Sequence, residues 1–414
     1  MLQRWMSADR QILHWRTGHA LLRGLFCTSL RKMRGSSLTV DTVIPYLIER
    51  NLVSVASIVE GDLEVIDAGR RNQNLKIVRR RGPSYLIKQP GEGEGATDAT
   101  IRCEASFYKY CELDPGAADI RAHLPAVHGW DENRGLLILE LIDGRPLWAH
   151  YDATPAPEFP SDAAAPLGDA LGTVHRIFRE QPSRPAWMAA LSAAPAWILF
   201  AHRPTPEILA RLSPANAEVL KMLQKDRPMA AGLDRLRTEW SPNTLIHNDI
   251  KGDNILVTAR DNEGVRVRTI DWELIQIGDA AWDVGTVFRD FLDYWLLSVP
   301  LSGDLAPEQM LEGAHLPLAK LHPAARAFWD AYRISARMDA DSAGTFLLRS
   351  LRFAAARMAQ GAYELSSGVH EPSNLAIAML QLAANVLADP RDASLHLFGI
   401  PAPWRKTGHA PHNG

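Results

Sequence analysis

Three side chains between residues 245 and 285 have the types and the order that phosphoryl transfer requires. Asp249 comes two residues after His247 and five before Asn254, and Asp271 follows a second apolar, β-branched run. Phosphoryl transfer needs a group that orients a hydroxyl and accepts its proton, and oxygen ligands that hold a metal ion against nucleotide phosphates. Carboxylate and amide oxygens suit Mg²⁺, a hard cation. We therefore expect Asp249 to act as the base, and Asn254 and Asp271 to bind Mg²⁺.

A β-hairpin is expected to position these groups. Residues 255–258 and 265–270 have the composition of strands, and the polar turn 259–264 joins them. Asp249 and Asn254 then precede the first strand, and Asp271 follows the second. The hairpin would gather them at one end.

The motifs of this stretch resemble those of a known family. The spacing H-x-D-x-x-x-x-N, followed by an apolar strand and I-D-W, is similar to the catalytic and metal motifs of kinase-fold phosphotransferases. It most resembles the aminoglycoside phosphotransferase and choline kinase-like superfamily, in which a G-D-x-x-x-D segment follows, as Gly278, Asp279 and Asp283 do here. The resemblance implies an α+β, bilobal protein-kinase-like fold with a small antiparallel-sheet N-lobe and a large, mainly helical C-lobe. It also implies ATP or GTP and Mg²⁺ as cofactors, and a supporting role for Asp283 behind the catalytic loop.

Two positions depart from the pattern of the superfamily. Asn248 stands where a glycine usually precedes the catalytic aspartate, and Lys251 stands where a histidine usually follows it. A lysine at the second position is the protein-kinase form, so Lys251 is a candidate for stabilising charge in the transition state. The alternative is a surface lysine that pairs with Asp253.

The segments that would form the N-lobe sheet come earlier in the chain. Residues 63–66, 75–78 and 84–89 alternate as antiparallel strands do. The first connection lies where a phosphate-covering loop is expected, and Gly69 with Asn72 fits the loose Gly and Asn pattern of the superfamily. An ordinary hairpin turn is the alternative.

Lys88 ends the third of these strands, where a kinase holds the lysine that contacts the nucleotide phosphates. Glu104, sixteen residues later on an expected helix over 97–113, is its predicted partner. The strand expected over 136–142 would end at the hinge between the lobes, where backbone groups of Glu140 and Ile142 could bind the nucleotide base.

The C-terminal part reads as mainly helical from Ala163 on. His175, beside an apolar stripe, is expected to be a buried structural residue. The apolar segment 186–201 is expected to be one buried helical segment. A late helix carries Arg349, Arg352 and Arg357, which we interpret as a solvated basic face, with a site for an anionic substrate as the alternative.

Composition limits the remaining possibilities. The 414 residues are 46% hydrophobic and 22% charged with a net charge of −3, which is typical of a soluble globular protein and lacks the basic excess of nucleic-acid binders. No apolar run reaches the length of a membrane span, so no membrane partner is expected. Three cysteines without metal-ligand spacing (Cys27, Cys103 and Cys111) indicate reduced thiols and a cytoplasmic location.

We expect three regions. Residues 1–36, with seven Arg or Lys and one Asp, are a basic extension that we interpret as disordered; a transit peptide, a basic tail or a misassigned start are the alternatives. Residues 37–140 would form the N-lobe and 141–414 the C-lobe.

The predicted activity is Mg²⁺-dependent transfer of the terminal phosphoryl group of ATP or GTP to a hydroxyl of a small molecule or peptide. The last twenty residues contain no Asp or Glu, which disfavours a polycationic aminoglycoside as the acceptor. One alternative is a Ser/Thr kinase of a ribosomal precursor peptide in a lanthipeptide-like pathway. An alternative of another class is a pseudokinase-like scaffold that binds nucleotide without turnover.

Overall fold

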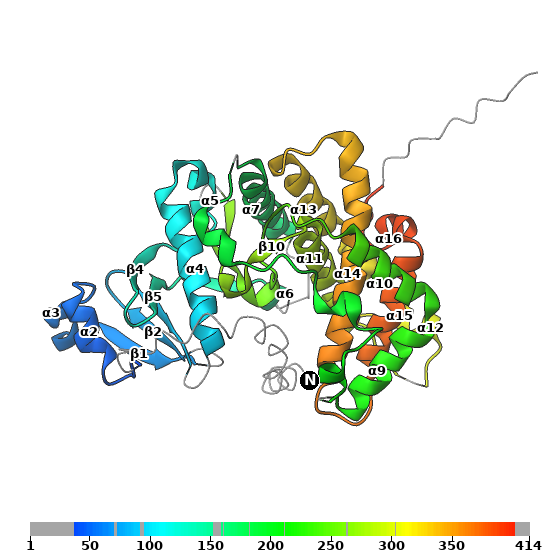
Figure 1. Ribbon diagram of the computed structural model, residues 1–414, viewed down its shortest axis with the longest axis horizontal. Helices are drawn as coiled ribbons and strands as arrows, with labels where there is room; N and C mark the ends of the chain where they lie inside the picture. The colour runs from blue at the N-terminus through cyan, green and yellow to red at the C-terminus, as the bar shows by residue number, and fades with distance from the viewer. Residues whose placement is uncertain are drawn as a thin grey trace, which may run out of the picture.

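The computed structural model describes residues 37–69, 73–91, 95–151, 159, 161–181, 183–210, 212–261, 264–302 and 304–401. A lobe built on a sheet lies at the blue end of the chain, and a larger helical part follows it (Figure 1). The predicted α+β, bilobal architecture is confirmed. The expected basic extension over 1–36 and Asn72 lie outside the described residues.

The first lobe is built on a five-stranded antiparallel sheet in the order β1-β2-β3-β5-β4. Its strands are β1 Leu63–Asp67, β2 Gln73–Arg79, β3 Tyr85–Gln89, β4 Val127–Asp131 and β5 Leu136–Glu140. Ile87 pairs with Leu75 on one side and with Ile138 on the other, so these side chains point to the same face.

Helices cover both faces of this sheet. On one face, α2 (Val43–Glu49) packs its buried apolar side chains against Ile87 and Ile138. The short helix α3 (Val55–Val59) follows α2. On the other face, α4 (Gly95–Leu113) packs against Leu137 and Leu139. Successive residues of β5 therefore enter two different cores, which is why its sequence is a continuous apolar run rather than an alternating one.

Short strands flank Asp249, Asn254 and Asp271. They belong to two small antiparallel sheets, β6-β8-β9 and β10-β7. The strands are β6 Gly144–Pro146, β7 Thr244–Ile246, β8 Ile255–Asp261, β9 Gly264–Thr269 and β10 Gln276–Gly278. The expected hairpin is present, but β8 runs three residues past its predicted end. A register irregularity between Thr258 and Asp261 lets pairing resume near the tip of the hairpin.

The second part of the chain consists mainly of helices (Figure 1). Apart from α5 Ala118–Arg121, which precedes β4 in the first lobe, they are α6 Trp148–Tyr151, α7 Ser161–Glu180, α8 Pro206–Leu209, α9 Pro214–Lys225, α10 Arg227–Glu239, α11 Ala280–Leu297, α12 Pro307–Glu312, α13 His322–Ser335, α14 Ala340–Leu365, α15 Asn374–Ala388 and α16 Pro390–His396. Short 3₁₀ turns cover Pro115–Ala117, Ala186–Ala190, Trp197–Phe200, Gly252–Asn254, Trp272–Leu274 and Leu318–Lys320.

Two of these helices approach each other closely behind the catalytic loop. A Cβ added at Gly285 of α11 would lie 2.5 Å from the Ser350 carbonyl oxygen of α14. Only glycine permits this separation, and the close contact fixes α14 against α11. The two helices carry several of the charged groups described below.

One helix prediction is wrong. Residues 186–201 were expected to form one buried helical segment, and they form two separate 3₁₀ turns instead. Pro195 lies between the two turns, where its missing N–H and fixed φ prevent a continuous helix. In the part of the chain that the structure describes, we find no helix both long and apolar enough to cross a membrane.

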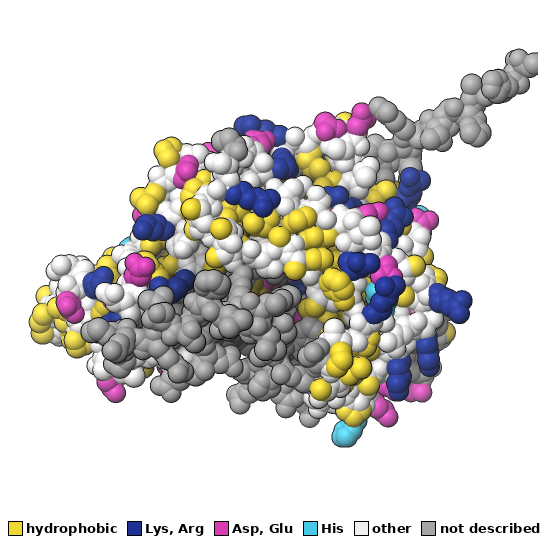
Figure 2. Space-filling model, viewed as in Figure 1, with side chains coloured by type: hydrophobic (Ala, Val, Ile, Leu, Met, Phe, Trp, Pro, Cys, Tyr) yellow, Lys and Arg dark blue, Asp and Glu magenta, His cyan; other side chains and the backbone are white. Residues whose placement is uncertain are grey.

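Figure 2 shows basic and acidic side chains mixed over the face that it presents. This matches the small net charge of −3.

Candidate active site

The loop that carries Asp249 is held from behind by Asp283, in the first turn of α11. The Asp283 carboxylate is fully buried and accepts hydrogen bonds from the backbone N–H groups of His247 (2.7 Å) and Asn248 (3.0 Å). His175 Nε2 lies 3.3 Å from the same carboxylate, and His175 Nδ1 lies 3.0 Å from the Tyr332 hydroxyl. Burial acts to raise the pKa of Asp283, but the contact with His175 and the backbone bond from His247 outweigh it, so the pKa is lowered. A charged Asp283 fixes the course of the loop.

Asn248 adopts a backbone conformation that explains its departure from the usual glycine. Its φ is +67°, in the left-handed region. Glycine enters this region without strain, and asparagine is among the few other residues that adopt it readily. The Asn248 side chain also donates to the Leu274 carbonyl at 3.3 Å. An asparagine can therefore replace the glycine without changing the turn before Asp249.

His247 orients the backbone of Asp249. His247 Nε2 lies 2.9 Å from the Ile270 carbonyl oxygen, which can only accept, so Nε2 carries the proton. In the neutral ring Nδ1 is then an acceptor, and the Asp249 N–H donates to it at 3.3 Å. The loop residue and the end of β9 are linked through one imidazole.

The structure brings Asp249, Lys251 and Asn254 together. Asn254 Nδ2 donates to the Asp249 carbonyl oxygen at 2.8 Å and lies 3.3 Å from Asp249 Oδ2. Lys251 Nζ lies 3.2 Å from Asp249 Oδ2. The Asp249 carboxylate, foremost among its neighbours, raises the pKa of Lys251. The ion-pair partner of Lys251 is thus Asp249, not the Asp253 proposed as an alternative.

Lys88 is the meeting point of the two lobes. Its Nζ lies 2.6 Å from Glu104 Oε2 of α4 and 2.6 Å from Asp271 Oδ1, which is 183 residues away in sequence. Lys88 is 3% exposed and Glu104 is fully buried. Burial acts to lower the pKa of Lys88, but the two carboxylates outweigh it and the pKa is raised. Burial raises the pKa of Glu104 to about 7, with Lys88 opposing the shift.

Asp271 is held in an unusual conformation by the packing of the next residue. Its φ is +65° and its ψ +52°, a left-handed geometry that costs free energy outside glycine. The adjacent Trp272 is fully buried, stacks on Phe107 with ring centroids 4.4 Å apart and donates its backbone N–H to Glu104 Oε1 at 3.1 Å. Burial acts to raise the pKa of Asp271, but Lys88 outweighs it and the pKa is lowered. Trp272 is thus a positioning residue, and the motif I-D-W was its only signal in the sequence.

The remaining oxygen atoms of this cluster fit a magnesium ion. Asn254 uses its Nδ2 for Asp249, which leaves the amide oxygen, and Asp271 uses Oδ1 for Lys88, which leaves Oδ2. Across the described ranges, no group of three or more His, Cys, Asp or Glu side chains could hold a metal ion alone. Mg²⁺ at nucleotide sites commonly takes one or two protein oxygens and completes its shell with phosphates and water. Asn254 and Asp271 are suited to that arrangement.

The predicted nucleotide contacts outside this cluster have mixed outcomes. The Gly69 N–H donates to Asp67 Oδ1 at 2.8 Å, a tight turn directly after β1. The Glu140 N–H already donates to the Ala126 carbonyl at 2.8 Å, and its carboxylate pairs with Arg268 of β9 at 2.6 Å. The Glu140 N–H is therefore not available to a base, and its carboxylate ties the end of β5 to the hairpin. A base contact by the Glu140 carbonyl stays a prediction.

The strand expected over 136–142 ends earlier than predicted. β5 ends at Glu140, because Glu140 is the last residue that pairs with β3, and Ile142 lies in the connection to β6. A base contact by the backbone of Ile142 stays a prediction.

Sequence reasoning missed a group of partly buried charged residues on α11. Asp290 Oδ2 accepts the Gly252 N–H at 2.8 Å, which links the helix to the catalytic loop. Arg289 Nε lies 2.5 Å from Asp293 Oδ2. Burial raises the pKa of Asp293 to about 7, with Arg289 opposing the shift. The available signal was the run R-D-F-L-D inside an otherwise apolar helix.

The three arginines of α14 do not form one solvated face. Arg349 pairs with Asp279 at 3.1 Å, Arg352 is half-buried, and Arg357 is 8% exposed. Their positions, three and then five residues apart, point in different directions around the helix. The predicted basic face is therefore wrong for Arg349 and Arg357.

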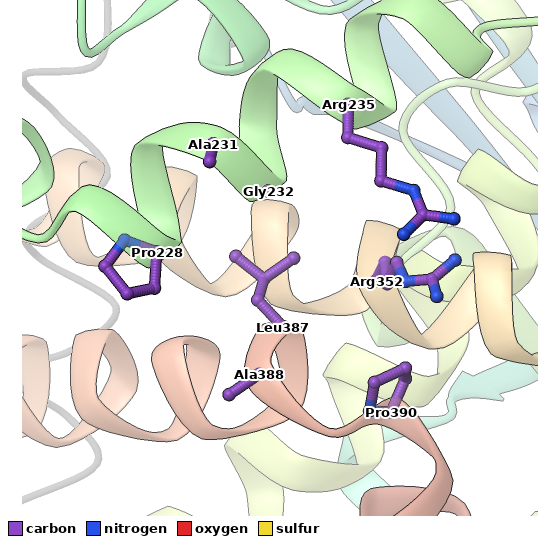
Figure 3. A pocket seen from close by; sticks show the side chains of 8 residues that line it. All are labelled: Pro228, Ala231, Gly232, Arg235, Arg352, Leu387, Ala388 and Pro390. Atoms are coloured by element: carbon purple, nitrogen blue, oxygen red, sulfur yellow. The ribbon is translucent and has the colours of Figure 1, made fainter.

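Arg352 lines a surface pocket of about 280 Å³ with Arg235 of α10. Figure 3 shows both guanidinium groups at the right of this pocket, with Pro228 and Ala231 of α10 at the left and Leu387 and Ala388 of α15 below. None of its lining residues belongs to the catalytic loop or to the Lys88 cluster.

A search of curated proteins found no match. Among solved structures, the fold is similar to a choline kinase from Cryptosporidium parvum Iowa II (14% identity, 86% of this chain and 98% of that chain, TM-score 0.48). It is also similar to a Plasmodium vivax ethanolamine kinase (14%, 83% and 89%, 0.45) and to the macrolide 2′-phosphotransferase MphH from Brachybacterium faecium (15%, 84% and 98%, 0.41). The model of the phosphotransferase enzyme family, APH, matches residues 62–328, well over half of the 414 residues. The chain therefore belongs to this phosphotransferase family.

Proposed function

We propose that the protein transfers the terminal phosphoryl group of ATP or GTP to a hydroxyl group of a small molecule or peptide. The observation that carries this proposal is the contact of Lys88 with both Glu104 and Asp271 at 2.6 Å. A buried lysine between two carboxylates from different lobes is the arrangement that positions nucleotide phosphates in kinases. The family match supports the same chemistry.

Each residue of the cluster has a role in this proposal. Lys88 would contact the nucleotide phosphates, and Glu104 would hold Lys88 in place. Asp249 would orient the acceptor hydroxyl and take its proton. The hydroxyl oxygen would form a bond to the terminal phosphorus as the bond from that phosphorus to the bridging oxygen breaks, and the nucleoside diphosphate would leave with those electrons.

Lys251 has a separate role. Its Nζ lies on the Asp249 carboxylate, so a phosphoryl group that approaches Asp249 also approaches this ammonium group. It would stabilise negative charge that develops during transfer.

Magnesium would be held by Asn254 and Asp271 through the two oxygens that their other contacts leave. When bound, the ion neutralises phosphate charge and fixes the phosphates in place. The chain's own contribution is to fix those two oxygens, through Asp249 for the amide and Lys88 for the carboxylate.

The other proposals concern the organisation of the chain and its setting. We keep the lobe boundary after residue 140, where β5 ends, and a cytoplasmic location. A Ser or Thr of a precursor peptide is the alternative acceptor to a small molecule.

The test is Asp249→Asn, which keeps the shape of the side chain and removes its basicity. We expect turnover to fall by about 10²- to 10⁴-fold, with nucleotide affinity largely unchanged. Release of ADP or GDP in the presence of a panel of hydroxyl compounds and peptides measures turnover, and equilibrium titration measures nucleotide binding.

Asp253→Asn is the matched control, because it makes the same change at an exposed position of the same loop. It should leave turnover near the wild-type value. Equal turnover of Asp249→Asn and wild type would remove Asp249 from the mechanism. Nucleotide binding without hydrolysis or transfer by the wild type would favour the scaffold instead.

A further inference from the structure

Arg357 is a buried cation without an ion-pair partner within 4 Å among the residues that the structure describes. It is 8% exposed, and its Nε atom is buried and makes no hydrogen bond. Its one close contact of a polar kind is with the Trp282 ring, whose centroid lies 5.2 Å from the guanidinium carbon. Burial lowers the pKa of Arg357, as expected for a cation that loses water without gaining a counter-ion.

The carboxylates closest in their effect on Arg357 each have another partner. Asp293 pairs with Arg289 at 2.5 Å, Asp290 accepts the Gly252 N–H, and Glu364 accepts from Gln360 Nε2 at 2.8 Å. No carboxylate therefore lies against the Arg357 guanidinium. Burying a cation is unfavourable unless a negative group compensates it, so the missing partner calls for an explanation.

The face of α14 that carries Arg357 meets α11 at Arg289. On α14, Arg357, Gln360, Gly361 and Glu364 follow the i, i+3, i+4, i+7 spacing of one helix face. Arg289 Nη2 lies 2.8 Å from the position that a Cβ of Gly361 would take, so α11 meets α14 at this face.

The connection continues from α11 to the loop. Asp290, next to Arg289, holds the Gly252 N–H two residues before Asn254. The Asp249 carboxylate is also among the charges that act on the pKa of both Arg289 and Arg357. α14 is thus linked to the loop through Arg289 and Asp290 of α11.

Three further buried atoms of this group form no hydrogen bond. Asp293 Oδ1 and Gln360 Oε1 are acceptors, whereas Arg289 Nε, like Arg357 Nε, is a donor on a cation. Buried polar atoms in native proteins are nearly always bonded, so several unbonded atoms on facing helices indicate a place where a ligand supplies the partners. The required ligand has an anionic group for Arg357 and N–H or O–H donors for the two acceptors.

We infer that Arg357 binds an anionic group, a carboxylate or a phosphate, on the acceptor whose hydroxyl is placed at Asp249. This inference rests on the proposed function and specifies the class of its acceptor. Arg357 sets specificity, and it takes no part in the transfer itself.

The test uses pairs of hydroxyl compounds that differ in one carboxylate or phosphate: glycerate and glycerol 3-phosphate against glycerol, and gluconate against sorbitol. Thermal stabilisation of the nucleotide-bound protein measures binding, and ADP release measures turnover. We expect at least one anionic compound to bind, or to react, on the order of 30-fold or more better than its uncharged counterpart. Arg357→Met should abolish that preference, and Arg357→Lys should restore part of it.

Arg352→Met is the matched control, because it removes a guanidinium from the same helix at the separate surface pocket. It should keep the preference. Since Arg357→Met could also disturb packing on Trp282, its affinity for ATP is measured alongside and should stay within about twofold of wild type.

Three results would overturn the inference: no preference for an anionic compound in any pair, a preference that survives in Arg357→Met, or a loss confined to ATP affinity, which would assign Arg357 to the nucleotide. These results are distinct from failure of the proposed function. That failure would appear as unchanged turnover in Asp249→Asn, whatever the charge of the acceptor.

Discussion

Replacing Asp283 with Asn should loosen the catalytic loop and destabilise the fold, although Asp283 is not expected to touch a substrate. The substitution keeps the size of the side chain and turns one carboxylate oxygen into an NH₂ group. The best orientation keeps an oxygen toward His247 and His175 and places the NH₂ group against the Asn248 N–H, donor against donor. The loop then loses the hydrogen bond from the Asn248 N–H. The hydrogen bond from the His247 N–H remains, but its acceptor is neutral.

The size of the effect can be worked from these contacts. A hydrogen bond to a charged acceptor contributes about 1.5–3 kcal/mol, and a buried N–H left without a partner costs about 1–3 kcal/mol. Asp283 is fully buried, so water cannot replace the lost partner. We expect a decrease of about 3–5 kcal/mol in the free energy of unfolding, within the range seen when one partner of a buried charged group is removed.

The assay is urea unfolding of wild type and Asp283→Asn, with turnover measured at a temperature where both are folded. Turnover should fall by at least about tenfold, because a shift of about 1 Å in a reacting group can reduce the rate by as much as 10². Asp339→Asn is the control: Asp339 is an exposed helix cap whose bond to the Ser342 N–H an asparagine can also make. A stability within about 0.5 kcal/mol of wild type, together with full turnover, would refute the reasoning.

The pH dependence gives a second measurement on the same residue. The pKa of Asp283 is lower in the folded than in the unfolded protein. Near and below the unfolded value of about 3.9, the unfolded state therefore binds more protons, and stability rises with pH. The contribution of Asp283 is present above that value and is lost as pH falls through the folded pKa. The difference in stability between wild type and Asp283→Asn should shrink as pH falls below about 4.

Two further predictions follow from the backbone geometry. Asn248→Gly should keep turnover within a few-fold of wild type, whereas Asn248→Ala should lower stability by about 1 kcal/mol because alanine is strained at a φ of +67°; equal midpoints of urea unfolding for the two variants would contradict this. Gly285→Ala should cost about 1–3 kcal/mol, since its Cβ would lie 2.5 Å from the Ser350 carbonyl oxygen; thermal unfolding measures it, and an unchanged midpoint would mean that α14 can move away from α11 freely.

Much of the fold could be predicted from local patterns. The alternation of residues in β1, β2 and β3 and the long apolar run of β5 predicted the sheet, because strand periodicity is a property of a few neighbouring residues. The failure at residues 186–201 came from apolar content without a helical period. Pro195 prevents a continuous helix there, so the segment forms two short turns.

The residues of the candidate site also form two groups: those that short sequence motifs could identify and those that only packing shows. Asp249, Asn254, Lys88 and Glu104 could be singled out because their motifs are short, and the structure brings each into contact with another member of the set. The buried charges of α11 and α14 could not be found this way. A charged residue in a helix usually faces water, and only its packing partners show that it does not.

The sequence by itself determined which chemical groups are present and their order along the chain: a base, two oxygen ligands and a lysine with its carboxylate. It also determined that Asn248 could occupy a position usually held by glycine, since that depends on one residue's own φ. The tertiary structure alone decided that Asp283 meets His175 across 108 residues, and that Arg357 is buried against Trp282 of α11 while Arg352 lines a surface pocket. The reason is that the direction of a side chain around its helix follows from the sequence, whereas the surface it meets there depends on how distant helices pack.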